Sequence, residues 1–587
     1  MELRKKIKRG IAVLLCMVMT LSLAACQKPE SKEEKAQREF NEYCDQLFLD
    51  MVGDDAMLIN FTFADPEKYG IKLENYSMGE YTVEEIEENE KWVEDTLNKL
   101  NEVDASLLTE RQQLSLKTLI AYFEKQNAYK GLYMLSNPFT TNTGVAANAN
   151  INFIEFIIDD EEDVKLYLEL IKDTERYIGQ ILDFAKLQSE QGYFMPSVCV
   201  DKNVEICENY LNAEENPLIA SFNEKIAALD IPEDKKNEYI ALDEQYINDY
   251  YNKAYQNIID TLTSLKGTTT NELGLCYFEN GKEYYTAIVK EKSSSDMGPE
   301  ELIKLLDDEM TALFTDYSTL YYSDQTLLDQ YMNLDFGMGS AEEILTFLAD
   351  NVNKEFPEPY TKDYIVKYQS KATEIEGTLA YYLTARLDEL NYNSIKVNRS
   401  AFGDDYTSMY STLAHEGFPG HLYQYTGVYG NEEIPDACKL LGFIGFTEGF
   451  AEYASDRAYV LGGCSEELAE FIVLNDMYGY IIQARIDLGI HYEGWDKEEC
   501  AEYCAEYGID ESVSDNIFDI TVSDPGLLIP YAVGHIKMRN LRDKAERKLG
   551  DAFDAVEFHK LILDTGLVTF EIMNDELDKY IKAKKEK

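Results

Sequence analysis

The segment 413–424, LAHEGFPGHLYQ, places two of the chain's five histidines six positions apart. Zinc favours imidazole and carboxylate ligands, and His415, Glu416 and His421 offer both groups in one short stretch. In the common H-E-x-x-H helix the histidines are four positions apart and face the same ion. A spacing of six puts them about 240° apart around an ideal helix, so a regular helix could not bring both rings to one metal.

The residues between these histidines predict a distorted helix. Pro419 lacks a backbone N–H and disfavours helical geometry at Phe418. Gly417 and Gly420 allow unusual backbone dihedral angles. We therefore expect the helix to bulge or break at 417–420, which would let the two imidazoles converge. The spacing alone leaves two interpretations open, a metal site or a helix end with two incidental histidines.

A second segment, FTEGFAEYASDRAY at 446–459, favours the metal interpretation. It is expected to be helical, and it starts about 25 residues after the histidines, which is enough for a turn and a return pass. Glu448 could supply a carboxylate ligand. Glu452, one turn later on the same face, could accept a hydrogen bond from a ligand imidazole. The alternative for Glu452 is a solvated acidic face, which is common in so acidic a chain.

Four motifs together resemble a known family. HEGFPGH, EGFAEY, ARIDLGIHYEGW and PGLLIPYAVGHIKMRNLRDKAERKLGDAF look like the bacterial domain-of-unknown-function family 885, which is similar to the gluzincin zinc peptidases. The resemblance spreads over roughly residues 40–585. It implies a mainly α fold, with a long-helix body around a deep cleft and a small β-sheet. It also implies one zinc ion per chain, with His415, His421 and Glu448 as ligands.

The resemblance implies catalytic roles for further residues. Glu416 becomes the general base, which takes a proton from the attacking water, and Tyr531 the donor to the oxyanion. His491 and His535 are further catalytic candidates, and for both a structural role is the alternative. His559 is expected to be a helix-packing residue. The chain departs from the family pattern at Leu422, Phe450, Glu452 and Ser455, none of which is an expected ligand or the base.

The net charge and the N-terminal residues indicate which partners and which cellular location to expect. The sequence has 54 basic and 110 acidic residues, a net charge of −56, which excludes the clustered basic surface that nucleic acid requires. The first 25 residues read as a basic segment and an apolar run, and LAAC at 23–26 resembles a bacterial lipobox. We therefore expect a signal peptide at 1–25, a lipid anchor on Cys26 and an extracytoplasmic, cell-membrane lipoprotein. The alternatives are an ordinary secretion signal and a membrane-anchoring helix.

The rest of the chain predicts one helical body at 41–587, preceded by a polar tether at 26–40. Apolar periodicity predicts helices at 161–192 and 235–267, and Pro299 with the acidic residues after it predicts another helix start. Asn280-Gly281 between β-prone flanks predicts a hairpin in 273–289, and a strand is expected near 394–399. The body is expected to divide into an N-terminal lobe, 41–290, and a catalytic part, 291–587.

These observations favour a membrane-tethered zinc metallopeptidase that hydrolyses peptides or short oligopeptides outside the membrane. Its partners would be a peptide substrate and, through the lipid anchor, the membrane. The alternative is a peptide- or solute-binding lipoprotein without catalytic activity. Solute-binding proteins usually alternate strand and helix, and strand signals are scarce in this sequence.

Overall fold

The computed structural model is mainly α-helical with a small sheet, as the sequence predicts. It describes residues 30–53, 55–72, 76–374, 377–403 and 405–586. The expected signal peptide and lipidation site Cys26 lie outside these residues. Among the described residues, none of the helices is long and apolar enough to cross a membrane.

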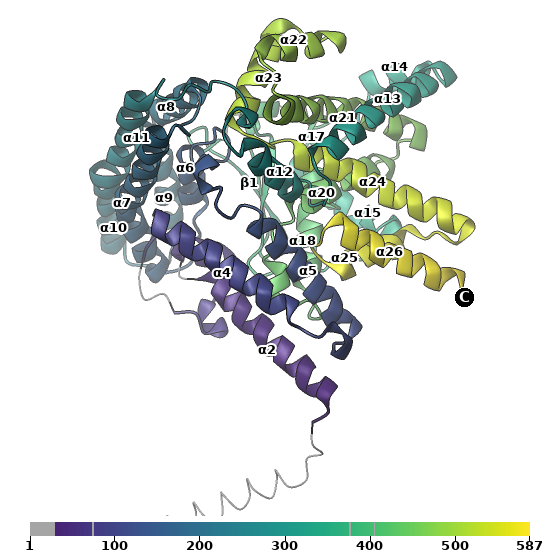
Figure 1. The fold of residues 1–587 in the computed structure, drawn as a ribbon, viewed down its shortest axis with the longest axis horizontal. Coiled ribbons are helices and arrows are strands. Elements are labelled where there is room, and N and C mark those ends of the chain that lie inside the picture. The colour runs from purple at the N-terminus through teal and green to yellow at the C-terminus, as the bar shows by residue number, and fades with distance from the viewer. Residues whose placement is uncertain (1–29, 54, 73–75, 375–376, 404, 587) are drawn as a thin grey trace, which may run out of the picture.

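The first helices of the described chain are α2 (Lys32–Val52), α3 (Ala56–Thr62), α4 (Val83–Asn101) and α5 (Glu110–Asn127). Helices α2, α4 and α5 lie along the lower side of the molecule in Figure 1. Helix α2 begins at Lys32, inside the segment 26–40 that was expected to be a polar tether. Ser31 and Glu34 form a capping box, with the N–H of Glu34 donating to Ser31 Oγ at 3.0 Å and the N–H of Ser31 to Glu34 Oε2 at 2.7 Å. Phe40 is already buried in the core.

A second group of helices gathers at the left of Figure 1 and surrounds a core of its own. These are α6 (Val145–Glu155), α7 (Glu161–Gln191), α8 (Ser197–Leu211), α9 (Pro217–Ala228), α10 (Glu233–Tyr246) and α11 (Asn252–Leu265). The predicted helix at 161–192 is confirmed, and Gly192 ends it in the left-handed conformation. The predicted helix at 235–267 exists but contains a π-helical turn, Ile247–Tyr251, between α10 and α11.

The remaining helices build a larger core that reaches back to the N-terminus. Phe40, Leu100, Leu119 and Phe123 belong to this larger core, although they precede the second group of helices. The smaller core takes its members from Ala56, Met57 and residues 139–262. The boundary between the cores therefore does not coincide with the expected lobe boundary near residue 290.

The expected hairpin at 273–289 is wrong, because this segment forms α12 (Gly281–Lys292) after a short 3₁₀ turn. Asn280 adopts a left-handed φ of 60° and begins the helix instead of turning a hairpin. Tyr285, Ile288 and Val289 are buried at the i, i+3, i+4 spacing of one helical face. Burial of that face explains why the segment is a helix despite its β-prone residues.

A three-stranded sheet stands beside the helical core. It consists of β1 (Ile365–Tyr368), β2 (Ala380–Leu383) and β3 (Ser394–Val397), in the order β1-β3-β2. β3 confirms the strand expected near 394–399. β1 pairs with it in parallel, and β2 pairs antiparallel, with Tyr382 opposite Ile395. β2 is thus an edge strand, and one side of its backbone is free for other partners.

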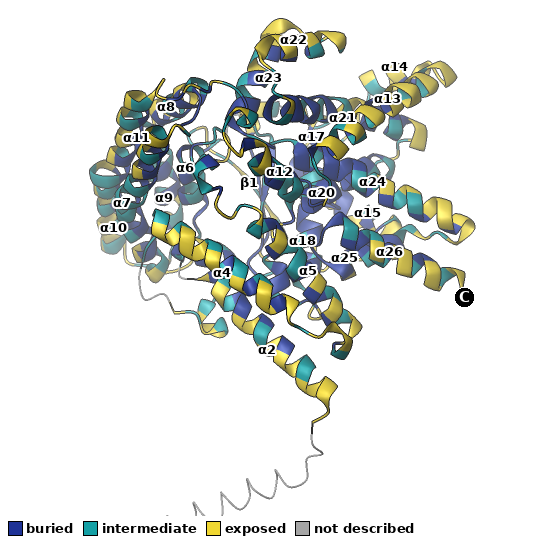
Figure 2. Ribbon diagram, in the orientation of Figure 1, coloured by how far each residue is buried: buried dark blue, intermediate teal, exposed yellow. Residues whose placement is uncertain are grey.

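The other elements of the larger core are α13 (Pro299–Ser323), α14 (Thr326–Met332), α15 (Ala341–Asn351), α17 (Met409–Glu416), α18 (His421–Tyr429), α20 (Ile444–Leu461), α21 (Glu466–Leu488), α22 (Lys497–Glu506), α23 (Glu511–Ser523), α24 (Ile529–Leu549), α25 (Ala555–Thr565) and α26 (Phe570–Lys585). Pro299 starts α13 as predicted. Figure 2 shows α17 and α20 buried at the centre, whereas α14 and α22 project into solvent. The two predicted site segments therefore lie in the middle of the protein.

Candidate metal centre

The predicted break between the two histidines is confirmed. α17 ends at Glu416 and α18 begins at His421, so residues 417–420 form a short non-helical connection. The Phe418-Pro419 peptide bond is cis, and the N–H of Gly420 donates to the carbonyl of Ala414 at 3.0 Å. The connection therefore folds back on the end of α17 and redirects the chain before His421.

Gly420 makes this close turn sterically feasible. A Cβ atom built on Gly420 would lie 1.8 Å from the carbonyl oxygen of His415. A contact that short is not tolerated, so the position requires glycine. Phe418, at the tip of the connection, is fully buried, and its packing holds the turn against the core.

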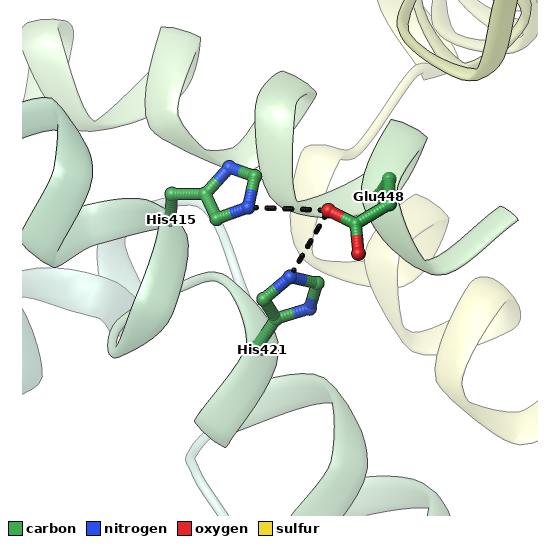
Figure 3. Close-up of side chains that lie close together, drawn as sticks. All are labelled: His415, His421 and Glu448. Carbon is green, nitrogen blue, oxygen red and sulfur yellow. Dashed lines mark ion pairs between the residues drawn. The ribbon is translucent and has the colours of Figure 1, made fainter. Parts of the chain in front are cut away.

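The redirected chain brings three side chains to one point (Figure 3). His415 Nε2 lies 3.4 Å and His421 Nε2 lies 3.3 Å from the same oxygen, Oε2 of Glu448 on α20. The two imidazole rings are nearly perpendicular, with centroids 4.7 Å apart and an interplanar angle of 88°. One ligand atom from each of the three residues lies within 4.8 Å of the others.

This geometry fits a metal ion. Two ligands at about 2.0–2.1 Å from a tetrahedral zinc ion lie about 3.3 Å apart, which matches both distances to Glu448. Glu448 Oε2 is buried and accepts no hydrogen bond from the residues that the structure describes, so a cation would give this oxygen a partner. Two imidazoles and one carboxylate leave a fourth tetrahedral position open, as catalytic zinc sites do.

Charges compensate one another at the site. Burial would lower the pKa of His415, but Glu448 and Glu452 outweigh it and raise that pKa well above its ordinary value. Burial would raise the pKa of Glu448, but His421 and His415 outweigh it and hold that pKa far below its usual range. Glu448 is thus ionised, as a metal ligand must be.

Glu452 lies on the far side of the first histidine. Its Oε1 is 3.3 Å from His415 Nδ1, the ring nitrogen that points away from Glu448. A carboxylate in this position fixes the tautomer of a ligand imidazole and raises its basicity. The structure thus brings Glu452 to the place that the sequence predicted for it, and the side chain is 12% exposed rather than part of a solvated face.

Glu416 approaches the site from the end of α17. Its Oε1 is 4.0 Å from His415 Nε2, and its Oε2 accepts a hydrogen bond of 2.9 Å from the N–H of Tyr382. The edge strand β2 therefore orients this carboxylate. Burial raises the pKa of Glu416, with His415 and His421 acting in the opposite direction. A carboxylate with a raised pKa is a stronger base than one in water.

Tyr531, in the first turn of α24, stacks over His415. The two rings are nearly parallel, with centroids 6.4 Å apart and an interplanar angle of 19°. Tyr480 of α21 also stacks on Tyr531, with ring centroids 5.7 Å apart and an interplanar angle of 23°. Burial and the carboxylates Glu448 and Glu416 raise the pKa of Tyr531 well above its ordinary value, so its hydroxyl stays protonated and can donate.

The two remaining catalytic candidates have other partners. His535 Nε2 is 2.6 Å from Asp456 Oδ2, two turns along α20 from Glu448. His491 lies elsewhere, where its Nδ1 accepts the N–H of Leu275 at 3.1 Å and its Nε2 donates to the carbonyl of Thr521 at 2.9 Å. Both ring nitrogens of His491 therefore bond to backbone groups. This arrangement agrees with a structural role for His491, the alternative to a catalytic one.

His559 is a packing residue, as expected. It is fully buried, stacks on Phe356 at 3.8 Å and lies 2.7 Å from the hydroxyl of Tyr453. Tyr382 and Tyr480 are site residues that the sequence did not identify. No motif marks either one, because each reaches the site through tertiary packing of an ordinary strand or helix.

Comparison with known proteins places the chain in a family. The model of a family described as bacterial protein of unknown function (DUF885) matches residues 67–577, and the chain belongs to that family. This finding confirms the resemblance of the motifs to domain-of-unknown-function family 885. No curated protein sequence matches the chain.

Two solved structures share the fold. A candidate lipoprotein from Colwellia psychrerythraea aligns with a TM-score of 0.79 at 17% identity, over 93% of this chain and 99% of that one. A candidate lipoprotein of unknown function from Shewanella oneidensis aligns with a TM-score of 0.57 at 13% identity, over the same shares. At these identities the likeness establishes the fold alone. A candidate oligoendopeptidase F from Bacillus anthracis str. Ames aligns with a TM-score of 0.34, which carries no argument.

Proposed function

We propose that the protein is a zinc-dependent metallopeptidase that hydrolyses peptides or short oligopeptides. The convergence of His415 Nε2 and His421 Nε2 on Glu448 Oε2, at 3.4 and 3.3 Å, carries this proposal. Glu416 lies beside the same point and Tyr531 stacks over it, so a base and a donor accompany the ligand set. We also propose that the fold is a gluzincin-like architecture, in which long helices surround a deep cleft.

In this reaction each of the site residues would have a separate role. A zinc ion, when bound, lowers the pKa of water and polarises the scissile carbonyl. Glu416 takes the proton of the attacking water on the oxygen that does not accept from Tyr382, and delivers it to the leaving amine. Tyr531 donates its hydroxyl proton in a hydrogen bond to the oxyanion. Glu452 holds the His415 ring in the orientation that points Nε2 at Glu448.

We also propose that the protein works outside the cytoplasm, anchored by a lipid on Cys26. The lipobox-like sequence LAAC supports this assignment, together with the high net negative charge. Two proteins that share the fold are described as candidate lipoproteins, which agrees with it. The substrates would then be peptides present at the outer face of the membrane.

Zinc content and peptide cleavage test the proposal together. Purified protein, supplied with zinc, should hold one ion per chain and cleave members of a quenched fluorescent peptide library. His415→Ala and Glu448→Ala should lose the metal, whereas Glu416→Gln should keep it and lose hydrolysis. Glu506→Gln, at the exposed end of α22, is the control and should match wild type. The proposal is refuted if wild-type protein binds none of the supplied zinc. If the protein binds zinc and peptides but does not cleave the peptides, the alternative of a binding lipoprotein without catalytic activity is correct.

A further inference from the structure

A cavity of about 490 Å³ lies apart from the three ligand residues, between the two hydrophobic cores. One wall comes from α7 and the segment 193–196, which belong with the smaller core. The opposite wall comes from α12 and the segment 522–527, which belong with the larger core. Ligand pockets occur preferentially at such interfaces and measure about 300–1,000 Å³.

The wall of this cavity is rich in aromatic rings. The lining residues include five tyrosines and one phenylalanine: Tyr81, Tyr129, Tyr177, Tyr193, Phe278 and Tyr284. Aliphatic residues and prolines make up much of the rest. Such a lining favours a flat aromatic or large apolar group, because rings pack against it by stacking and edge-to-face contact.

The two acidic side chains in the wall are already saturated by neutral donors. Glu291 accepts from Tyr129 Oη at 2.5 Å and from Gln126 Nε2 at 3.1 Å. Asp524 accepts from the backbone N–H of Asn142 at 2.6 Å and from the side chains of residues 141–143. Their oxygens are therefore committed to the protein rather than offered to a ligand.

Lys292 is the basic side chain in this wall, and its positive charge opposes the rise in the pKa of Asp487 that burial causes. Among the residues that the structure describes, its ammonium group makes neither a hydrogen bond nor an ion pair. The chain has twice as many acidic as basic residues, so a half-buried lysine that no described carboxylate contacts in an ion pair is unexpected. An ammonium group is a donor of three hydrogen bonds and attracts a carboxylate.

Lys292 also lies close to the helix that carries Glu448. It is the last residue of α12, and Ser294 accepts the N–H of Phe446, in the first turn of α20, at 3.2 Å. A Cβ built on Gly445 would lie 2.5 Å from the carbonyl oxygen of Lys292. Glu448 follows in the second turn of α20. On the other side, the cavity residues 524–527 lead directly into α24, which carries Tyr531.

We propose that this cavity binds the C-terminal residue of the peptide substrate, with an aromatic or large apolar side chain among the rings and the free carboxylate on Lys292. The proposal rests on the peptidase function proposed above and assigns it a substrate class, peptides with a free C-terminus and an aromatic last residue. Cleavage would then release short C-terminal fragments.

Binding of a small probe tests the cavity without requiring hydrolysis. Calorimetric titration with N-acetyl-phenylalanine and with its amide should show that the acid binds wild-type protein at least about tenfold more tightly, since a charge-assisted hydrogen bond is lost in the amide. The preference should persist after the zinc is removed with a chelator, which excludes the metal as the partner of the carboxylate.

Substitutions of Lys292 decide which group holds the carboxylate. Lys292→Met should abolish the preference for the acid, and Lys292→Arg should retain most of it. Lys290→Met, on the same helix but outside the cavity wall, is the matched control and should behave as wild type. Equal binding of acid and amide by wild type, or an unchanged preference in Lys292→Met, overturns the proposal. In that case Lys292 only balances the buried acids around it, among them Asp487.

A kinetic comparison distinguishes a substrate subsite from a site for a free aromatic acid. Peptides ending in phenylalanine should show a lower KM than their C-terminal amides, and Lys292→Met should remove this difference while kcat changes less than about twofold. Probe binding that depends on Lys292 but does not compete with peptide cleavage refutes the subsite. A protein that binds the probe yet cleaves no peptide refutes the peptidase function and leaves the cavity's carboxylate preference standing.

Discussion

Gly449 and Gly534 lie directly against each other where α20 crosses α24. A Cβ atom built on Gly449 would lie 2.3 Å from the carbonyl carbon of Gly534, so neither helix could approach this closely with a larger residue. Gly449 follows the candidate ligand Glu448, and Gly534 is one turn beyond Tyr531. The contact therefore sets the distance between the candidate metal ligand and the candidate oxyanion donor.

Gly449→Ala should consequently destabilise the protein by about 1–3 kcal/mol, because the added methyl group forces two packed backbones apart. Gly479→Ala is the matched control, since a Cβ on this glycine of α21 would have no neighbour within 4 Å in the described part of the chain. It should leave stability unchanged or raise it by up to about 1 kcal/mol through helix propensity. Urea unfolding of the three proteins measures both effects, and equal stabilities of the two variants would contradict the role of the crossing.

The parts of the fold that the sequence predicted correctly depend on local signals. α7 has apolar residues at helical spacing over its whole length and a terminal glycine, and both features act within a few residues. The break at 417–420 follows in the same way from Pro419 and the two glycines. The start of α2 at Lys32 also has a local signal, because Ser31 and Glu34 form a capping box.

The parts that could not be predicted depend on contacts between distant segments. The N–H of Tyr382 reaches Glu416 only because β2 lies at the edge of a sheet whose register is set by β3. Tyr480 reaches Tyr531 through the packing of α21 on α24. At Asn280 the local hairpin signal was misleading, because burial of one face of α12 outweighs turn propensity.

Removal of the carboxylate behind His415 should weaken metal binding without abolishing it. Glu452→Gln leaves a neutral acceptor 3.3 Å from His415 Nδ1, so the imidazole becomes less basic and less firmly oriented. Substitutions of such partners typically cost about 10–100-fold in metal affinity. Competition with a chromogenic zinc chelator should show a loss in this range.

Asp456→Asn provides the comparison for this variant. Asp456 is one turn further along α20 and pairs with His535, not with a candidate ligand. The zinc affinity of Asp456→Asn should stay within about twofold of wild type, since a carboxylate behind a histidine affects metal binding only when that histidine is a ligand. If Asp456→Asn weakens zinc binding as much as Glu452→Gln, a general loss of helix packing is responsible and the specific role of Glu452 is excluded.

His491 should make the stability of the protein fall in mildly acidic solution. Burial lowers its pKa from the ordinary 6.5 to about 4, so the unfolded chain binds a proton in this range that the folded protein does not. The stabilisation is therefore complete above pH 6.5 and is lost progressively as the pH falls toward 4, by up to about 3 kcal/mol. Urea unfolding between pH 7 and 5 should show a steeper decline for wild type than for His491→Gln, and parallel curves would contradict it.

Gly420→Ala is the sharpest test of the path between the two histidines. The new methyl group would overlap the carbonyl oxygen of His415 at 1.8 Å, so residues 417–420 must open and His421 must move away from Glu448. Zinc affinity should fall at least about tenfold, because the displaced His421 can no longer coordinate the ion together with His415 and Glu448. Gly442→Ala should bind zinc as wild type does, because a Cβ at this position lies more than 4 Å from every described neighbour outside its own chain segment. A Gly420→Ala protein that binds zinc normally would show that the tight turn is not what brings His421 to the site.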